Sequence, residues 1–293
     1  MVTEANHREL AVVQLPHPGG EWGPDPNTHD RGWTDWNHNH ARKFLQHSGL
    51  YQDERGNVVA SPMTFWGEWE GPSSCEPTVS VERGMPAWFQ VPRRGDLQSV
   101  PRPQNTDPFV FGSFLYSNCQ QDHEWPKGSG KYRQFATSRL AVGSVILFGS
   151  TRLGAFVLDT CFVVGDVIEI DSVHFVEQVA GRVPEAFVDA TLRPIFIDVR
   201  ERKLSLYLGA EHDKPASSMY SFFPCSPVGN QPVAFPRPEL DLKGTLGTFV
   251  NPKSSRRFTR HPCTLEFAQG AWMEVRRQVE RAGRSLGVFA DPL

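Results

Sequence analysis

Residues 140–164, LAVGSVILFGSTRLGAFVLDTCFVV, carry the clearest secondary-structure pattern of the chain. This stretch holds two apolar runs, 144–149 and 154–164, which are rich in Val, Ile and Phe and are separated by a few turn residues. Such runs, bracketed by glycine, are typical of β-strands joined as a hairpin. Because the runs are apolar throughout instead of alternating with polar residues, we expect both faces of the hairpin to be buried.

On either side of the hairpin the pattern predicts further strands and few helices. Strands are expected at 9–14, 63–70, 109–116, 166–170, 194–199 and 203–208. Helices are expected at 36–48, 182–190 and 264–282, with Gly49 and Gly283 ending the first and the last. The proline-rich segments 92–108 and 222–238 are expected to be irregular.

This order of elements predicts the fold class. Because the strands follow one another through short turns, we expect an α+β protein built on a curled, mostly antiparallel sheet with peripheral helices and a C-terminal helix. Residues 1–170 are expected to form the β-core with its N-terminal helix. Residues 171–293 are expected to form a C-terminal extension that packs on the core and ends in a helix.

Composition narrows the function. The 293 residues carry a formal net charge of -3, so the strong basicity typical of nucleic-acid-binding proteins is absent, although a local basic groove is compatible with this total. We see no apolar run of membrane-spanning length and no signal peptide, and expect a cytoplasmic protein without a membrane partner. The five cysteines include no Cys-x-x-Cys pair, which indicates reduced thiols. Common nucleotide, hydrolase and metal motifs are absent from the sequence, and we expect no cofactor and no metal.

The segment 65–70, FWGEWE, is the first candidate site. On a strand, Trp66, Glu68 and Glu70 share one face and Trp69 lies on the other. An indole beside a carboxylate suits a flat ligand with polar edges, because the ring stacks while the carboxylate accepts from an amino or imino group. The alternative is a sheet with core on one side and solvated acids on the other.

A second candidate follows Phe111 in the sequence. Tyr116, Asn118 and Gln120 alternate onto one face if the strand continues past residue 116. Amide side chains offer paired donors and acceptors that read the edges of bases. The alternative is a strand end whose amides cap turns.

Asp159 and the histidines are candidates for acid–base chemistry. Asp159 interrupts an apolar run, and a buried carboxylate must be paired or hydrogen-bonded, so it either orients a ligand or belongs to a structural network. His40 and His47 share one face of the expected helix, whereas His38 does not. One of these histidines could act as an acid or base, or two could bind zinc or iron with a remote carboxylate, but a solvated helix face is the alternative.

A basic group near the C-terminus is a candidate for phosphate contacts. It contains Arg256, Arg257 and Arg260, between two proline-containing turns. A basic loop of this kind suits the backbone of a nucleic acid, whereas the alternative is a solvated charged face.

Residues 140–164 resemble the central hairpin of the PUA-like superfamily, in its EVE, ASCH and YTH branches. In those branches a Leu-x-x-Gly-Asp-x-Val-x-Phe strand is followed by a glycine and an apolar strand; here Gly143-Ser144 stands in place of Gly-Asp. The resemblance implies a small curled β-barrel with flanking helices. It also implies an aromatic cage that takes one flipped or modified base. Our own reading of the residues supplies the ring candidates Trp66, Trp69, Phe111 and Tyr116.

We therefore expect a protein that recognises a modified nucleobase in DNA or RNA through an aromatic pocket, in a setting such as defence against foreign DNA. Glu68 and Asn118 would read the base edge. The alternative is an enzyme that acts on a nucleotide or a glycosidic bond, with Glu68 or Asp159 as acid or base and His40 as a partner. A third possibility is a non-catalytic subunit that binds another protein.

Overall fold

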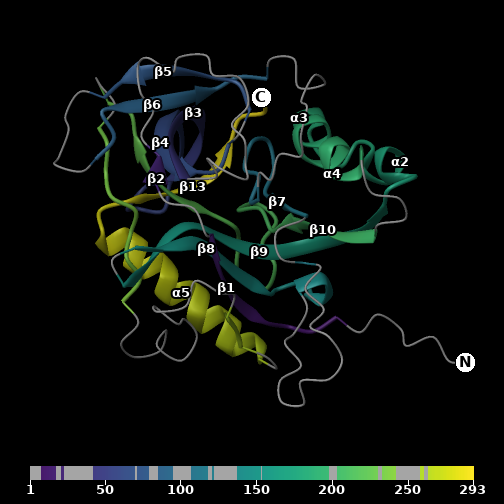
Figure 1. The fold of residues 1–293 in the computed structure, drawn as a ribbon. Helices are drawn as coiled ribbons and strands as arrows, with labels where there is room; N and C mark the ends of the chain where they lie inside the picture. Colours follow the sequence, from purple (N-terminus) through teal and green to yellow (C-terminus); the bar gives the residue numbers. More distant parts are fainter. Residues whose placement is uncertain are drawn as a thin grey trace, which may run out of the picture.

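The computed structural model describes residues 8–17, 21–22, 42–69, 71–78, 85–94, 107–117, 121, 137–152, 154–197, 203–229, 233–241, 258–260 and 263–293. Their strands form two mixed sheets with a small number of helices around them (Figure 1). The α+β class expected from the sequence is confirmed.

The first sheet contains the predicted hairpin at its centre. Its strands, in spatial order, are β12 (Phe258–Arg260), β1 (Val12–His17), β8 (Val145–Arg152), β9 (Ala155–Asp171), β10 (Lys203–Gly209) and β7 (Leu115–Tyr116). β8 and β9 pair antiparallel from Val145 opposite Val163 to Arg152 opposite Ala155. β1 runs parallel to β8, while the other neighbours are antiparallel.

Both faces of the hairpin are covered, which explains its continuous apolarity. Ile146 and Phe148 point into one core cluster, and Val145 and Leu147 point into another. Helix α5 (Leu265–Arg281) packs on the second cluster through side chains that include Trp272. The short helices α2 (Phe175–Val179), α3 (Glu185–Phe187) and α4 (Arg193–Ile197) lie on the other side of the sheet from α5 (Figure 1).

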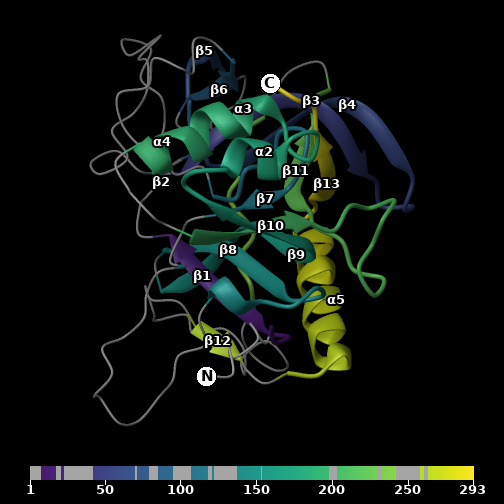
Figure 2. The same cartoon turned by 90° about the vertical axis from the view of Figure 1, so that its right-hand side faces the viewer.

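The second sheet is strongly curled. Its path is β13 (Ser285–Ala290), β11 (Phe223–Pro227), β4 (Val58–Gly67), β3 (Arg42–Gln52), β6 (Trp88–Pro92) and β5 (Ser73–Pro77), with β2 (Glu21–Trp22) beside β3. β13 pairs with both β11 and β3, so the four strands β3, β4, β11 and β13 form a closed ring of pairings. Figure 2 shows β3 and β4 bending together beside β11 and β13.

Glycines permit the close approach of these strands. A Cβ at Gly49 would collide with the backbone carbonyl oxygen of Phe289, and a Cβ at Gly287 would collide with the ring of Phe223. Gly49 therefore lies inside a strand, where it allows β13 to approach β3, and it does not end a helix as expected.

The predicted N-terminal helix is wrong where the structure describes it. Residues 42–48 belong to β3, which pairs with β4 from Lys43 opposite Gly67 to Gln52 opposite Val58. This long-range pairing overrides the local helical pattern. Residues 36–41 lie outside the described part of the chain.

Three other expectations need correction. Residues 194–197 lie in α4 and not in a strand, because Ile195 and Phe196 are buried on the main core from a helix. Of the strand expected at 109–116, only Leu115 and Tyr116 are paired as β7, while Phe109 and Phe111 form isolated bridges. The proline-rich segment 222–238 contains a strand, β11.

The single curled barrel expected around the hairpin is not confirmed, because the hairpin lies in one of two mixed sheets. The expected boundary at residue 170 falls at the end of β9. Strands from both sides of that boundary take part in both sheets. No helix among the described residues is long and apolar enough to cross a membrane.

We predict opposite effects for two Gly→Ala changes. Gly49→Ala should lower the free energy of unfolding by about 1–3 kcal/mol, because the new methyl group collides with backbone. Gly270→Ala in α5, where a Cβ meets nothing within 4 Å, should raise it by up to about 1 kcal/mol through helix propensity. Chemical denaturation of both variants checks this; equal effects would contradict the tight packing of β3 against β13.

Asp171 should titrate well below its ordinary range. Its carboxylate accepts from the backbone N–H groups of His174 and Val173 and from the side chain of Gln178, which lowers its pKa from 3.8 to about 2. Because the folded pKa is depressed, the stabilisation is present above pH 3.8 and is lost as the pH falls through about 2. NMR titration of this carboxyl group, with Asp171→Asn as control, measures the shift; an unperturbed titration would refute it.

Candidate functional site

Four buried charged side chains from separate segments meet where the two sheets face each other. They are Arg42 at the start of β3, Glu68 just after β4, Asp159 in β9 and Arg237 in the irregular segment 233–241. Their relative exposures are 0%, 2%, 1% and 3%, so water is largely excluded from all four. We call these residues the charge cluster.

One guanidinium group joins the two carboxylates. Arg42 donates from Nε to Asp159 and from Nη1 to Glu68. Arg237 donates from Nη1 to the other oxygen of Asp159 at 2.8 Å, and from the same atom to Ser150 Oγ at 2.8 Å. The two predicted acid–base residues, which are far apart in the sequence, are therefore held by the same arginine.

The charges of the cluster balance, with two guanidinium groups against two carboxylates. Burial by itself lowers the pKa of Arg42, but the fields of Asp159 and Glu68 outweigh this effect and raise the pKa above its ordinary value. Arg42 therefore stays protonated. Its Nη2 has no hydrogen-bond partner among the described residues, which leaves one buried donor for a further acceptor.

An aromatic cluster adjoins the charge cluster. It consists of Phe44, Trp66, Phe89, Ala234 and Phe235, and it is separate from the two larger cores. Trp66 Nε1 donates to the carbonyl oxygen of Phe235 at 2.6 Å. The guanidinium carbon of Arg237 lies 5.8 Å from the centre of the Trp66 ring, so one arginine contacts both clusters.

The predicted cage rings divide between the aromatic cluster and the main core. Trp66 belongs to the aromatic cluster, whereas Trp69 packs in the main core, 5.4 Å from the ring of Phe111. Tyr116 is also in the main core and stacks on Tyr207 with ring centres 5.5 Å apart. The four predicted cage rings thus lie in two clusters, and each is at most 2% exposed.

Of the other predicted site residues, the structure describes only His47 and the backbone of Arg260. His47 in β3 is away from the charge cluster: its Nε2 lies 3.0 Å from the carbonyl oxygen of Asp291, and burial lowers its pKa. Arg260 ends the edge strand β12, where the structure describes the backbone only. The remaining residues lie outside the described part of the chain: His38, His40, Glu70, Asn118, Gln120, Arg256 and Arg257.

Sequence reasoning missed the two arginines of the charge cluster. Arg42 lies at the N-terminal end of β3 and Arg237 stands between two prolines, and neither belongs to a local motif. The usable signal was Asp159, because a buried carboxylate must be paired or hydrogen-bonded. The identity of that partner depends on pairing between distant strands.

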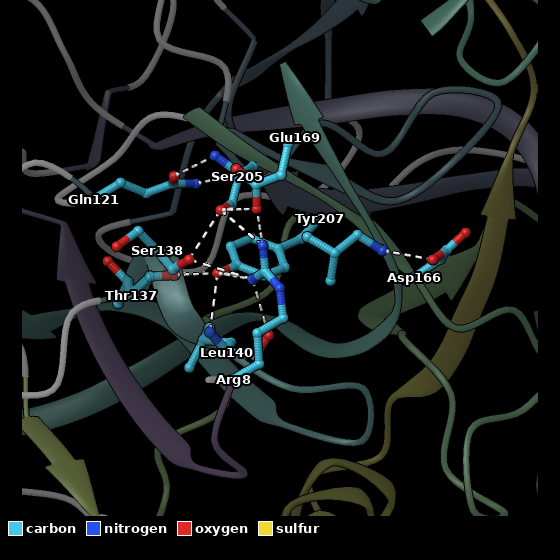
Figure 3. Close-up of polar contacts among 10 residues, drawn as sticks. Arg8, Gln121, Thr137, Ser138, Leu140, Asp166, Glu169, Ser205 and Tyr207 are labelled. Carbon is cyan, nitrogen blue, oxygen red and sulfur yellow. Dashed lines mark hydrogen bonds and ion pairs between the residues drawn. The ribbon is translucent and has the colours of Figure 1, made fainter. Parts of the chain in front are cut away.

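A second polar cluster surrounds Tyr207 (Figure 3). Arg8 donates to the carbonyl oxygens of Ser138 and Leu140 and to Glu169, and Tyr207 donates to the carbonyl oxygen of Thr137 at 2.5 Å. These bonds fasten the N-terminal segment and the turn at 137–140 to β9 and β10. Burial raises the pKa of Tyr207, and we assign this cluster a structural role.

Within the described ranges, no group of three or more His, Cys, Asp or Glu residues is placed to hold a metal ion. No family model matches the chain, and no curated protein or solved structure matches it either. The geometry of the two adjoining clusters is therefore the basis for a functional proposal.

We predict that Asp159→Asn is strongly destabilising. It removes the carboxylate that Arg42 and Arg237 share, and removing one partner of a buried ion pair costs about 3–5 kcal/mol. The matched change Asp189→Asn, in the partly exposed Asp189–Arg193 pair, should cost less than about 1 kcal/mol. Urea denaturation measures both; a small loss for Asp159→Asn would mean that the charge cluster contributes little to the fold.

Proposed function

We propose that the protein recognises a nucleobase of DNA or RNA beside Trp66 and Glu68, where the charge cluster meets the aromatic cluster. The observation that carries this proposal is the contact of Arg237 with both Trp66 and Asp159. A base needs a flat apolar partner for its face and donors and acceptors for its edge. This junction supplies an indole, two carboxylates and two guanidinium groups.

The sequence resemblance supports the same class of ligand. The hairpin β8–β9 is similar to the one in the PUA-like superfamily, and Ser150 and Asp159 of the site lie on its two strands. Our proposal includes a modified base as the preferred ligand, a cytoplasmic setting and a role in defence against foreign DNA. Phosphate contacts by the basic group at 256–260 are part of the same proposal.

An enzyme is the second candidate, and a specific observation favours it. Glu68 and Asp159 both bind Arg42, so two carboxylates are available within one buried site. In a reaction on a nucleotide or a glycosidic bond, one carboxylate would transfer the proton and the other would stabilise developing positive charge. Both candidate functions involve a nucleobase ligand. They differ in whether the protein converts that ligand into a product.

The test uses the full chain with short DNA and RNA oligonucleotides that carry plain or modified bases. Binding is measured at two salt concentrations, and the oligonucleotides are then analysed by mass spectrometry. We expect binding that weakens with salt, since phosphate contacts release counterions. No binding to any oligonucleotide at low salt would reject the proposal.

Two tryptophan variants locate the site. Trp66→Leu should weaken binding by about 5- to 100-fold, because stacking on an aromatic ring contributes roughly 1–3 kcal/mol per base. Trp272→Leu is the matched control: it also removes a buried indole that donates to a backbone carbonyl, in this case that of Tyr220 at 2.8 Å. Equal losses in the two folded variants would place the site elsewhere.

Glu68→Gln distinguishes an enzyme from a protein that only binds the base, which we call a reader. A reader should keep intact oligonucleotide and lose affinity only modestly, because a glutamine still accepts a hydrogen bond. An enzyme should release a base or change the oligonucleotide mass, and Glu68→Gln should abolish that product. Glu169→Gln, on a side chain that is 55% exposed, is the control for the loss of one carboxylate.

A further inference from the structure

The ring of Phe235 lies beside a guanidinium group and an aromatic ring. Its ring centre lies 4.2 Å from the guanidinium carbon of Arg284 and 5.4 Å from the ring centre of Phe44, which meets it edge-on at 86°. Unpaired bases are commonly held against the plane of a guanidinium group and against aromatic rings. Phe235 is itself 3% exposed, so its ring fills this position completely.

Phe235 comes from a segment that belongs to no strand or helix. Residues 233–241, which we call the covering segment, are irregular. Their C-terminal part is fastened to β9, since Leu158 N–H donates to Pro238 O at 2.9 Å and Leu240 N–H donates to Phe156 O at 3.0 Å. Toward the N-terminal end, the carbonyl oxygen of Phe235 accepts from the side chain of Trp66.

The covering segment also carries Arg237, and this links the two clusters. Arg237 binds Asp159 and Ser150 and lies over the Trp66 ring. If residues 233–237 move away while residues 238–240 stay on β9, Phe235 leaves the aromatic cluster and Arg237 leaves Asp159. One movement then uncovers a stacking surface and the groups that bind a base edge.

We propose that the aromatic cluster is a nucleobase slot that the chain closes with its own Phe235, and that a single base enters by displacing this ring. This proposal rests on the proposed function, since it uses Trp66 and the charge cluster as the binding groups. The base stacks under Arg284 and contacts Phe44, with Trp66 in the same aromatic cluster, while Arg42 Nη2 and the oxygens of Asp159 bind its edge. Only an unpaired or flipped nucleotide fits, because the position of the Phe235 ring is buried.

Removal of the Phe235 ring, which we call the plug, tests the proposal. Phe235→Ala should bind adenosine, cytidine and 5-methylcytidine about tenfold or more tightly than the unchanged protein, because the base no longer has to expel a ring whose stacking is of similar strength. Phe222→Ala is the matched control, since Phe222 is a fully buried ring that packs on Tyr220 and Trp272 outside the slot. Tighter binding by Phe235→Ala alone supports the proposal, and equal affinities in the two variants overturn it.

Two further measurements keep the test decisive if Phe235→Ala does not fold. Phe235→Leu keeps an apolar side chain of similar volume but has no ring to stack under Arg284, so it should bind the nucleosides more tightly than the unchanged protein. Hydrogen exchange of the unchanged protein should become faster at residues 233–237 when base is bound, while the amide of Leu240 keeps its protection. Slower or unchanged exchange at 233–237 in the bound protein would overturn the proposal.

The results separate this proposal from the proposed function. Oligonucleotide binding by the unchanged protein, with no gain in the Phe235 variants and no change in exchange, refutes the plug and leaves nucleobase recognition standing. Nucleoside binding by Phe235→Ala, with no binding by the unchanged protein to nucleoside or oligonucleotide, supports the slot and refutes recognition by the closed protein. No binding by either folded protein refutes both.

Discussion

Asp159 imposes the constraint on which the arrangement of the two sheets depends. Its carboxylate lies in the middle of β9, the strand with apolar neighbours on both faces, and it is 1% exposed. A buried charge of this kind is tolerated only when positive groups and hydrogen bonds surround it. Arg42 from the second sheet and Arg237 from the covering segment meet that need, so three separate parts of the chain are held at one point.

The same constraint accounts for four charged side chains lying together in the interior. An apolar contact between the sheets would cost less desolvation than four buried charges. The charge cluster instead keeps oriented donors and acceptors in a dry environment, where electrostatic interactions are strong. Such a site suits the recognition of hydrogen-bonding edges, provided that a ligand can reach it. The covering segment is the element that controls access in our proposal.

The aromatic residues of the chain serve two different purposes. Many of the buried rings, including Trp69, Phe111 and Tyr116, belong to the large core, to which both sheets and the short helices contribute. Trp66 and Phe44 lie on the opposite face of the second sheet, in a small cluster that borders charged groups. Trp66, Trp69, Phe111 and Tyr116 were predicted to form one cage because the sequence does not show which face each ring occupies relative to a partner sheet.

Local sequence was sufficient to predict the buried hairpin, the α+β class, the C-terminal helix and the requirement that a buried Asp159 be paired or hydrogen-bonded. Each of these four predictions follows from local periodicity or from the cost of burying a charge. None of them requires knowledge of a distant strand. Only the tertiary structure decided that residues 42–48 form a strand, that Glu68 and Asp159 share Arg42, and that Phe235 lies under Arg284. These contacts join residues far apart in the chain, and their energies arise only when β3, β9 and the covering segment are brought together.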